Sequence, residues 1–91
     1  MTTNGTWLKI DEKRAMLDLQ AAVNSLDRAD SELVIDCSGV RRLDPREVEA
    51  LEDLANQAEG RQVRVVLHGV NVDVYKVLRL VKLAPRFSFT N

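Results

Sequence analysis

The chain has 91 residues, of which 45% are apolar and 30% charged, and its formal net charge at pH 7 is −1. This composition is too apolar for a disordered chain, and a single cysteine excludes both an internal disulfide framework and a four-cysteine zinc site. The balanced charge disfavours a dedicated nucleic-acid binder, and no apolar run approaches the ~20 residues that span a bilayer. The polar first residues predict no signal peptide and a cytoplasmic location.

The apolar pattern predicts alternating strands and helices. In chain order these are a strand over 6–10, a helix over 12–27, a strand over 32–37, a helix over 45–59, a strand over 62–68, a helix over 72–83 and a short strand over 86–89. Helices of this length are long enough to cross between parallel strands. We therefore expect a single small α/β domain over residues 1–91, with a four-stranded, mainly parallel sheet and three helices.

Local signals mark where the predicted helices begin and end. The strongest start lies at 44–47, sequence DPRE, where the Asp suits the N-cap, the Pro the first helical position and the Glu the closing position of a capping box. Asp11 and Asn71 offer N-caps to the other two helices. Gly60 is placed to end the second helix, and Pro85 prevents the third from continuing.

Few residues are candidates for chemistry. Cys37 and His68 each follow an apolar strand, but neither has an evident base or metal-ligating neighbour, so a structural role is favoured for both. The acidic pairs Glu47/Glu49 and Glu52/Asp53 are expected on the solvent face of the second helix rather than as an acid–base pair. No catalytic residue, metal ligand or cofactor is therefore predicted.

One enzymatic alternative stays open. Ligands of open α/β sheets bind at the carboxyl ends of parallel strands, where Asp36, Cys37 and His68 are predicted to lie. A small nucleotide-binding or enzymatic α/β domain would use these residues, although no glycine-rich phosphate loop is present.

Charge is segregated in the second half of the chain. Residues 44–60 contain six acidic residues and one basic residue, a net charge of −5, whereas residues 61–91 contain six basic residues and one acidic residue, a net charge of +5. Two interpretations stay open for the acidic helix: a solvated face, or a surface that steers a basic partner. The basic third helix lacks the interleaved aromatic residues of a nucleic-acid binder.

The stretch from Leu33 to Asp44, sequence LVIDCSGVRRLD, resembles the signature of the STAS family, the sulfate-transporter and anti-sigma-factor-antagonist domains. That family has an apolar strand ending in Asp, then a loop containing Ser, then an Asp that opens the second helix. The ranges 5–8, 48–51 and 63–67 are similar to its early strand, its second helix and its next strand.

Two departures from the family pattern bear on function. Members that act as phosphorylation switches carry an acceptor Ser or Thr two residues after the Asp, and Arg46 occupies that place here. Because Arg cannot accept the phosphoryl group in that scheme, phosphorylation at the usual position is not expected. Glu47 stands where the family has glycine. Many members also begin with one more strand, whose absence would leave a sheet edge open to another chain.

The resemblance implies a non-enzymatic protein–protein interaction module similar to an anti-sigma factor antagonist. Its implied partner is an anti-sigma kinase-like regulator. The alternative is a small subunit of a membrane lipid or anion transport complex, bound to a transporter ATPase or permease. A homodimer through the exposed sheet edge is a further expectation, whereas nucleic acid and direct membrane insertion are not expected. Carried over by position, the contact surface comprises Leu43, Asp44, Pro45, Arg46, Glu47 and Glu49.

Overall fold

The computed structural model describes residues 5–29 and 31–90. The polar start at residues 1–4 lies outside the described residues. The elements, in chain order, are β1 (Gly5–Lys9), a 3₁₀ turn η1 (Glu12–Arg14), α1 (Ala15–Ser25), β2 (Glu32–Asp36), α2 (Pro45–Gly60), β3 (Arg64–His68), α3 (Val72–Leu80), a 3₁₀ turn η2 (Ala84–Arg86) and β4 (Ser88–Thr90).

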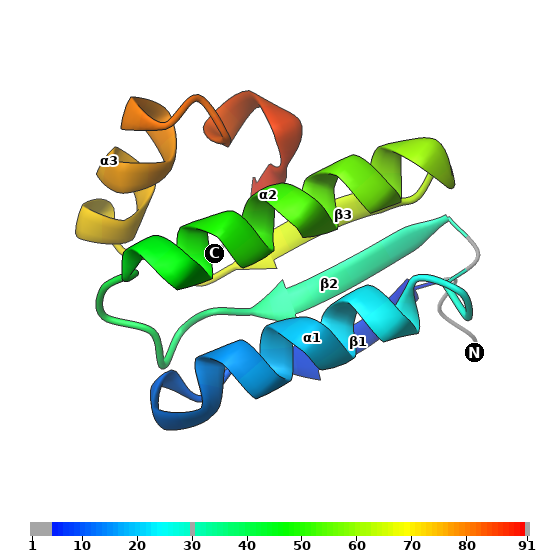
Figure 1. The fold of residues 1–91 in the computed structure, drawn as a ribbon, viewed down its shortest axis with the longest axis horizontal. Coiled ribbons are helices and arrows are strands. Elements are labelled where there is room, and N and C mark those ends of the chain that lie inside the picture. Colours follow the sequence, from blue (N-terminus) through cyan, green and yellow to red (C-terminus); the bar gives the residue numbers. More distant parts are fainter. Residues whose placement is uncertain (1–4, 30, 91) are drawn as a thin grey trace.

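The four strands form one sheet in the order β1-β2-β3-β4, and every neighbouring pair is parallel. The predicted fold class, a four-stranded, mainly parallel sheet with three helices, is confirmed. When strands follow one another in chain order, crossovers of the usual right hand all return over the same face of the sheet. Accordingly, α1 and α2 run side by side along one face, in front of the strands in Figure 1.

The two faces of the sheet differ in what covers them. On β2 and β3, the side chains of Leu33, Ile35, Val65 and Leu67 point to the helices and belong to the main apolar cluster. The alternate residue Val66 is also buried but lies outside that cluster, because successive side chains of a strand point to opposite faces. Within the described residues, no helix covers this second face, which we call the open face.

The first and last helices differ from the sequence-based expectation at their ends. The predicted helix over 12–27 is divided, because Arg14, the last residue of η1 and the N-cap of α1, takes a non-helical conformation (φ −128°, ψ 26°). The predicted helix over 72–83 ends at Leu80 rather than near Pro85. Lys82 has a left-handed φ of 65°, which closes the helix three residues before the proline.

Two predicted strands begin later than expected, for equally local reasons. Gln62 has a left-handed φ of 59°, so the extended backbone of β3 begins at Arg64 instead of residue 62. Pro85 and Arg86 lie in η2, which delays β4 to Ser88–Thr90 from the predicted 86–89. The second helix extends through Gly60, and its C-cap is Arg61 rather than the glycine.

Candidate functional site

The start of α2 is a fully formed capping box. The Asp44 carboxylate accepts a hydrogen bond from the Glu47 backbone N–H at 2.8 Å, and the Glu47 carboxylate accepts one from the Asp44 N–H at 3.0 Å. Pro45 occupies the first helical turn, where its missing N–H costs nothing. These contacts fix the direction in which α2 leaves the preceding loop.

The residues predicted for this surface are placed unequally. Asp44, Pro45, Arg46 and Glu49 are exposed, and Leu43 is half-buried against the apolar core. Glu47 is only 8% exposed, the one buried charged residue of the described chain. Its expected place on the solvent face is therefore wrong, because the capping box draws its carboxylate back to the backbone of Asp44.

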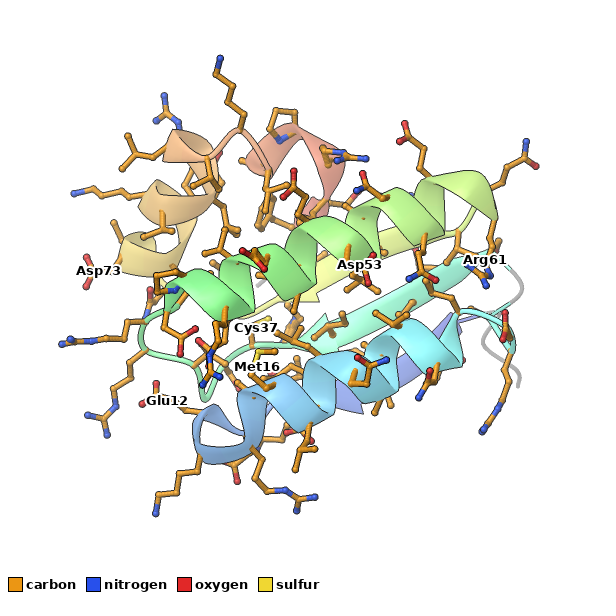
Figure 2. All side chains as sticks on the ribbon, in the orientation of Figure 1. Glu12, Met16, Cys37, Asp53, Arg61 and Asp73 are labelled. Atoms are coloured by element: carbon orange, nitrogen blue, oxygen red, sulfur yellow. The ribbon has the colours of Figure 1, made fainter. Side chains whose placement is uncertain are left out.

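The loop between β2 and α2, residues 37–44, is held from two sides by contacts that the sequence does not indicate. The Glu12 carboxylate, from η1, accepts a hydrogen bond from the Arg41 backbone N–H. The Asn71 side chain donates from Nδ2 to the carbonyl oxygens of Val40 at 3.3 Å and Arg41 at 3.0 Å. These partners lie about thirty residues from the loop in sequence, and Figure 2 shows Glu12 beside it. We call residues 37–44 with the first turn of α2 the docking loop.

The docking loop itself carries three guanidinium groups. Arg41, Arg42 and Arg46 are all exposed, and none lies within ion-pair distance of a carboxylate among residues 5–29 and 31–90. The positive end of the α2 dipole lies at the same place. These three positive charges lie beside the carboxylates of Asp44 and Glu12, and we call the end of the surface that bears the three arginines its tip. The sequence analysis placed Arg46 on the contact surface. The RR dipeptide a few residues earlier was the signal that could have added Arg41 and Arg42.

A groove runs from this tip along the seam between α1 and α2. It has a volume of about 280 Å³, and its lining residues are Met16, Leu19, Gln20, Val23, Arg46, Glu49, Ala50 and Asp53. Figure 2 shows Met16 on the α1 side and Asp53 on α2. Arg46 thus joins the tip to a partly apolar groove whose α2 wall is acidic.

Comparisons with known proteins place this arrangement in a family. The family model described as "Mlab, STAS domain" matches residues 8–85. The chain belongs to the STAS family.

Solved structures agree with that assignment at the level of the fold. A crystal structure of the proposed anti-sigma factor antagonist TM1081 from Thermotoga maritima has a TM-score of 0.72 and 17% identity, covering 100% of this chain and 76% of that one. An NMR structure of the protein TM1081 has a TM-score of 0.77 and 15% identity, covering 98% and 75%. At this identity the likeness shows the fold alone. A search of curated proteins finds no match.

Asp36, Cys37 and His68 lie at the carboxyl ends of β2 and β3, as the sequence predicts. The side chain of Cys37 is buried, and burial together with the nearby charge of Asp36 raises the pKa of its thiol to about 12. Such a thiol is protonated at neutral pH and is a poor nucleophile. His68 contacts Thr90 through Nδ1 and Oγ1 at 3.0 Å and meets the Trp7 ring edge-on, with centroids 5.4 Å apart.

The sheet topology also bears on the nucleotide alternative. Ligands of open α/β sheets bind where the strand order reverses and neighbouring crossovers diverge. Here the four strands follow in chain order, so the described sheet has no such switch point. Within the same residues, no three His, Cys, Asp or Glu side chains gather as a metal site. None of the helices described is long and apolar enough to cross a bilayer.

Proposed function

We propose that this STAS domain is a non-enzymatic protein-binding module, similar in role to an anti-sigma factor antagonist, and that its partner binds the docking loop. The supporting observation is the combination of an exposed, charged helix start with a loop held by Glu12 and Asn71. A surface whose geometry is fixed before binding loses less conformational entropy when a partner arrives. Leu43, Asp44, Pro45, Arg46 and Glu49 form the contact, and Glu47 supports it from beneath.

The charges of the site define what the partner presents. Arg41, Arg42 and Arg46 call for carboxylates opposite the tip, where the α2 dipole adds to the positive potential. One turn along α2, Glu49 and Asp53 call for basic groups instead. A partner with this ordered charge pattern would bind in one orientation, because reversing it would place like charges together.

The absence of a hydroxyl at residue 46 makes binding independent of phosphorylation at that position. Arg46 is exposed and occupies the place that resembles the acceptor site of phosphorylation-switched members. An anti-sigma kinase-like regulator would therefore bind the chain without switching it there. The same observation favours a second candidate, a constitutive cytoplasmic subunit of a membrane lipid or anion transport complex, held by an ATPase or permease subunit.

The experiment is a quantitative affinity capture from lysate of the source organism with wild type, Arg46→Glu and Arg28→Glu. Arg28 is exposed in the turn after α1, so its reversal changes the net charge equally without touching the docking loop. A true partner is captured by wild type and R28E but not by R46E. Once purified, that partner should bind R46E at least ~30-fold more weakly than wild type, a difference of about 2 kcal/mol.

The outcome also separates the two candidates. A captured kinase-like regulator supports the anti-sigma role, and a captured transporter ATPase or permease supports the transport role. Equal capture by all three proteins would reject the docking loop as the binding surface. A nucleotide titration that raises the melting temperature of the isolated chain would instead revive the enzymatic alternative.

We further propose a homodimer through the outer edge of β1, which is an end strand of the described sheet. The Ile10 N–H donates to Asp36 O at 3.0 Å, so alternation along the strand points the Trp7 and Lys9 N–H groups away from β2. Lys9→Pro would remove one of these donors while keeping the contacts to β2. Wild type should show a concentration-dependent mass in analytical ultracentrifugation that K9P lacks; a wild-type monomer at every concentration would reject the dimer.

A further inference from the structure

The outer side of α3 exposes several large apolar side chains among its charged residues. Leu80 is 81% exposed and Val72 67%, and Tyr75 and Val81 are exposed as well. Val72, Lys76 and Leu80 are spaced by four, so they form one stripe along the side of α3 opposite its buried residues Val74 and Leu78. The docking loop does not use this stripe.

Three cations lie on or beside this stripe. Lys76, Arg79 and Lys82 are exposed, and no carboxylate of the described chain lies within ion-pair distance of them. Asp73, at the outer start of α3 in Figure 2, is the single acidic residue of the range 61–91. The net charge of this surface is therefore positive, and no ion pair within the described residues neutralises it.

Arg79 lines two hollows. One, of about 320 Å³, is lined by Lys76, Arg79 and Leu80. The other, of about 440 Å³, is lined by Tyr75, Arg79, Lys82, Ala84, Pro85 and Phe89. The rings of Tyr75 and Phe89 meet edge-on in its wall, with centroids 5.1 Å apart. Each hollow is large enough to accept an apolar side chain beside a guanidinium group.

We infer that the outer side of α3, with η2 and Phe89, is a second protein-binding surface that accepts an acidic amphipathic helix of a different chain. The apolar side chains of that helix fill the two hollows, and its carboxylates pair with Lys76, Arg79 and Lys82. Apolar anchors in pockets surrounded by charge complementarity are the usual design of helix-in-groove recognition. This surface is separate from the docking loop, so the domain can bridge two proteins.

Other occupants fit less well. A second copy could offer its acidic α2, but none of the large exposed apolar side chains of the described chain lies on α2, so nothing would fill the hollows. An anionic membrane would take up the exposed side chains of Leu80 and Val72, but it would leave the hollow lined by Tyr75, Arg79 and Phe89 unfilled. An acidic amphipathic helix matches both the charge and the shape.

The probe is a fluorescein-labelled 18-residue peptide with leucines on one helical face and glutamates on the other. A peptide of the same composition with the leucines dispersed is its control. We expect the amphipathic peptide to shift the amide NMR signals of residues 72–90 but not those of the docking loop. In fluorescence polarisation it should bind at least about fivefold more tightly than the dispersed peptide.

Matched variants locate the binding. Arg79→Glu and Leu80→Ser should each weaken the amphipathic peptide about tenfold. Arg28→Glu and Leu17→Ser, which make the same changes at exposed positions of the α1 region, should leave it unchanged. R46E should also leave it unchanged, so failure here is distinguishable from failure of the docking loop.

Several results would overturn the inference. Absence of binding, equal binding of the dispersed peptide, or equal loss with R28E would show attraction by net charge alone. If the chain instead bound vesicles of phosphatidylcholine with phosphatidylglycerol more tightly than the peptide, and R79E abolished that binding, the surface would be a lipid site. Self-association that R79E or L80S abolishes would make a second copy the occupant.

Discussion

The helix-covered core of the sheet and the rim at the carboxyl ends of its strands are stabilised in different ways. The core is an apolar cluster in which Leu33, Ile35 and Leu67 lie under α1 and α2. The rim, where the docking loop lies, is held by hydrogen bonds that the Glu12 carboxylate accepts and the Asn71 amide donates. Stability therefore depends mainly on side-chain volume in the first region, and site geometry depends on a few polar contacts in the second.

The largest expected effect compares neighbouring residues on opposite faces of β3. Val65 and Val66 have the same side chain and similar burial, 3% and 5% exposed, but only Val65 belongs to the core cluster. Val65→Ala should lower the free energy of unfolding by about 2–3 kcal/mol, because packed helices cannot collapse into the cavity. Val66→Ala should lower it by about 1 kcal/mol, because flexible side chains and water can fill the gap.

Urea unfolding followed by circular dichroism measures both values. Equal costs for the two variants would mean that the open face is packed as tightly as the core. That result would point to a cover on this face in solution, such as a bound partner, and would remove the contrast between the two regions.

The second effect tests the backbone at the rim. Gly69 has a left-handed φ of +75°, and a Cβ there would lie 2.9 Å from the Cβ of Ser38. Gly69→Ala should therefore cost about 1–2 kcal/mol through strain and contact with the docking loop. Gly60 is the control, since a Cβ added there meets nothing within 4 Å and the residue is helical.

Gly60→Ala should be neutral or stabilise the chain by up to about 1 kcal/mol, because alanine favours helix more than glycine does. The same urea titration serves both variants. If Gly69→Ala were as well tolerated as Gly60→Ala, the connection between β3 and α3 would not constrain the docking loop.

The same contrast explains how far the sequence could predict this molecule. Apolar spacing and the DPRE start predicted the fold and the cap of α2, because both depend on residues close together in the chain. The place of Glu47 in the capping box was predicted, but its burial was not. Helical spacing alone does not include the hydrogen bond from the Asp44 N–H that draws the Glu47 carboxylate inward. Local sequence patterns do not predict contacts between residues that only folding brings together.

The docking loop shows that limit most clearly. Asn71 was recognisable as a cap for α3, but its donation to Val40 and Arg41 joins residues 31 and 30 positions apart. The contact of Glu12 with Arg41 spans 29 positions. Likewise, α3 is closed by Lys82 in a left-handed conformation. Glycine usually marks such a position, and none stands there, so the sequence did not predict it.

The third prediction separates the two roles of Asn71. Its Oδ1 accepts from the Val74 N–H at 2.7 Å and caps α3, while its Nδ2 holds the docking loop. Asn71→Asp keeps the acceptor but removes both donors. We expect a loss of about 1 kcal/mol and faster hydrogen exchange at the Arg41 amide, with the exchange of α3 unchanged.

Asn71→Ala is the matched variant that removes both roles, so it should also speed exchange in the first turn of α3. Exchange at Arg41 that is the same in Asn71→Asp and wild type would show that Glu12 alone holds the loop. It would leave the polar side chain of Asn71 with a capping role only.

The smallest expected effect is a pH dependence at the rim. Asp36 accepts a hydrogen bond from the Ser38 backbone N–H at 2.9 Å. This bond, the Ser38 side chain, and the neighbouring His68 and Lys9 lower the pKa of Asp36 below its ordinary value of 3.8, against a smaller opposing effect of burial. A lowered pKa in the folded state contributes stability that is present above the unfolded pKa and lost as the pH falls through the folded value.

Asp36→Asn keeps an acceptor for the Ser38 N–H but has no charge to titrate. Wild type should therefore be slightly more stable than Asp36→Asn at pH 7, and the difference should shrink as the pH falls below about 4. Because the side chain of Asp36 is partly exposed and solvent screens its charge, the difference should stay smaller than the effect of Asn71→Asp. Comparing the two proteins at each pH cancels the contribution of the other carboxylates to the free energy of unfolding. A difference that grows on acidification would show that hydrogen bonding at this rim does not favour the ionised form of Asp36.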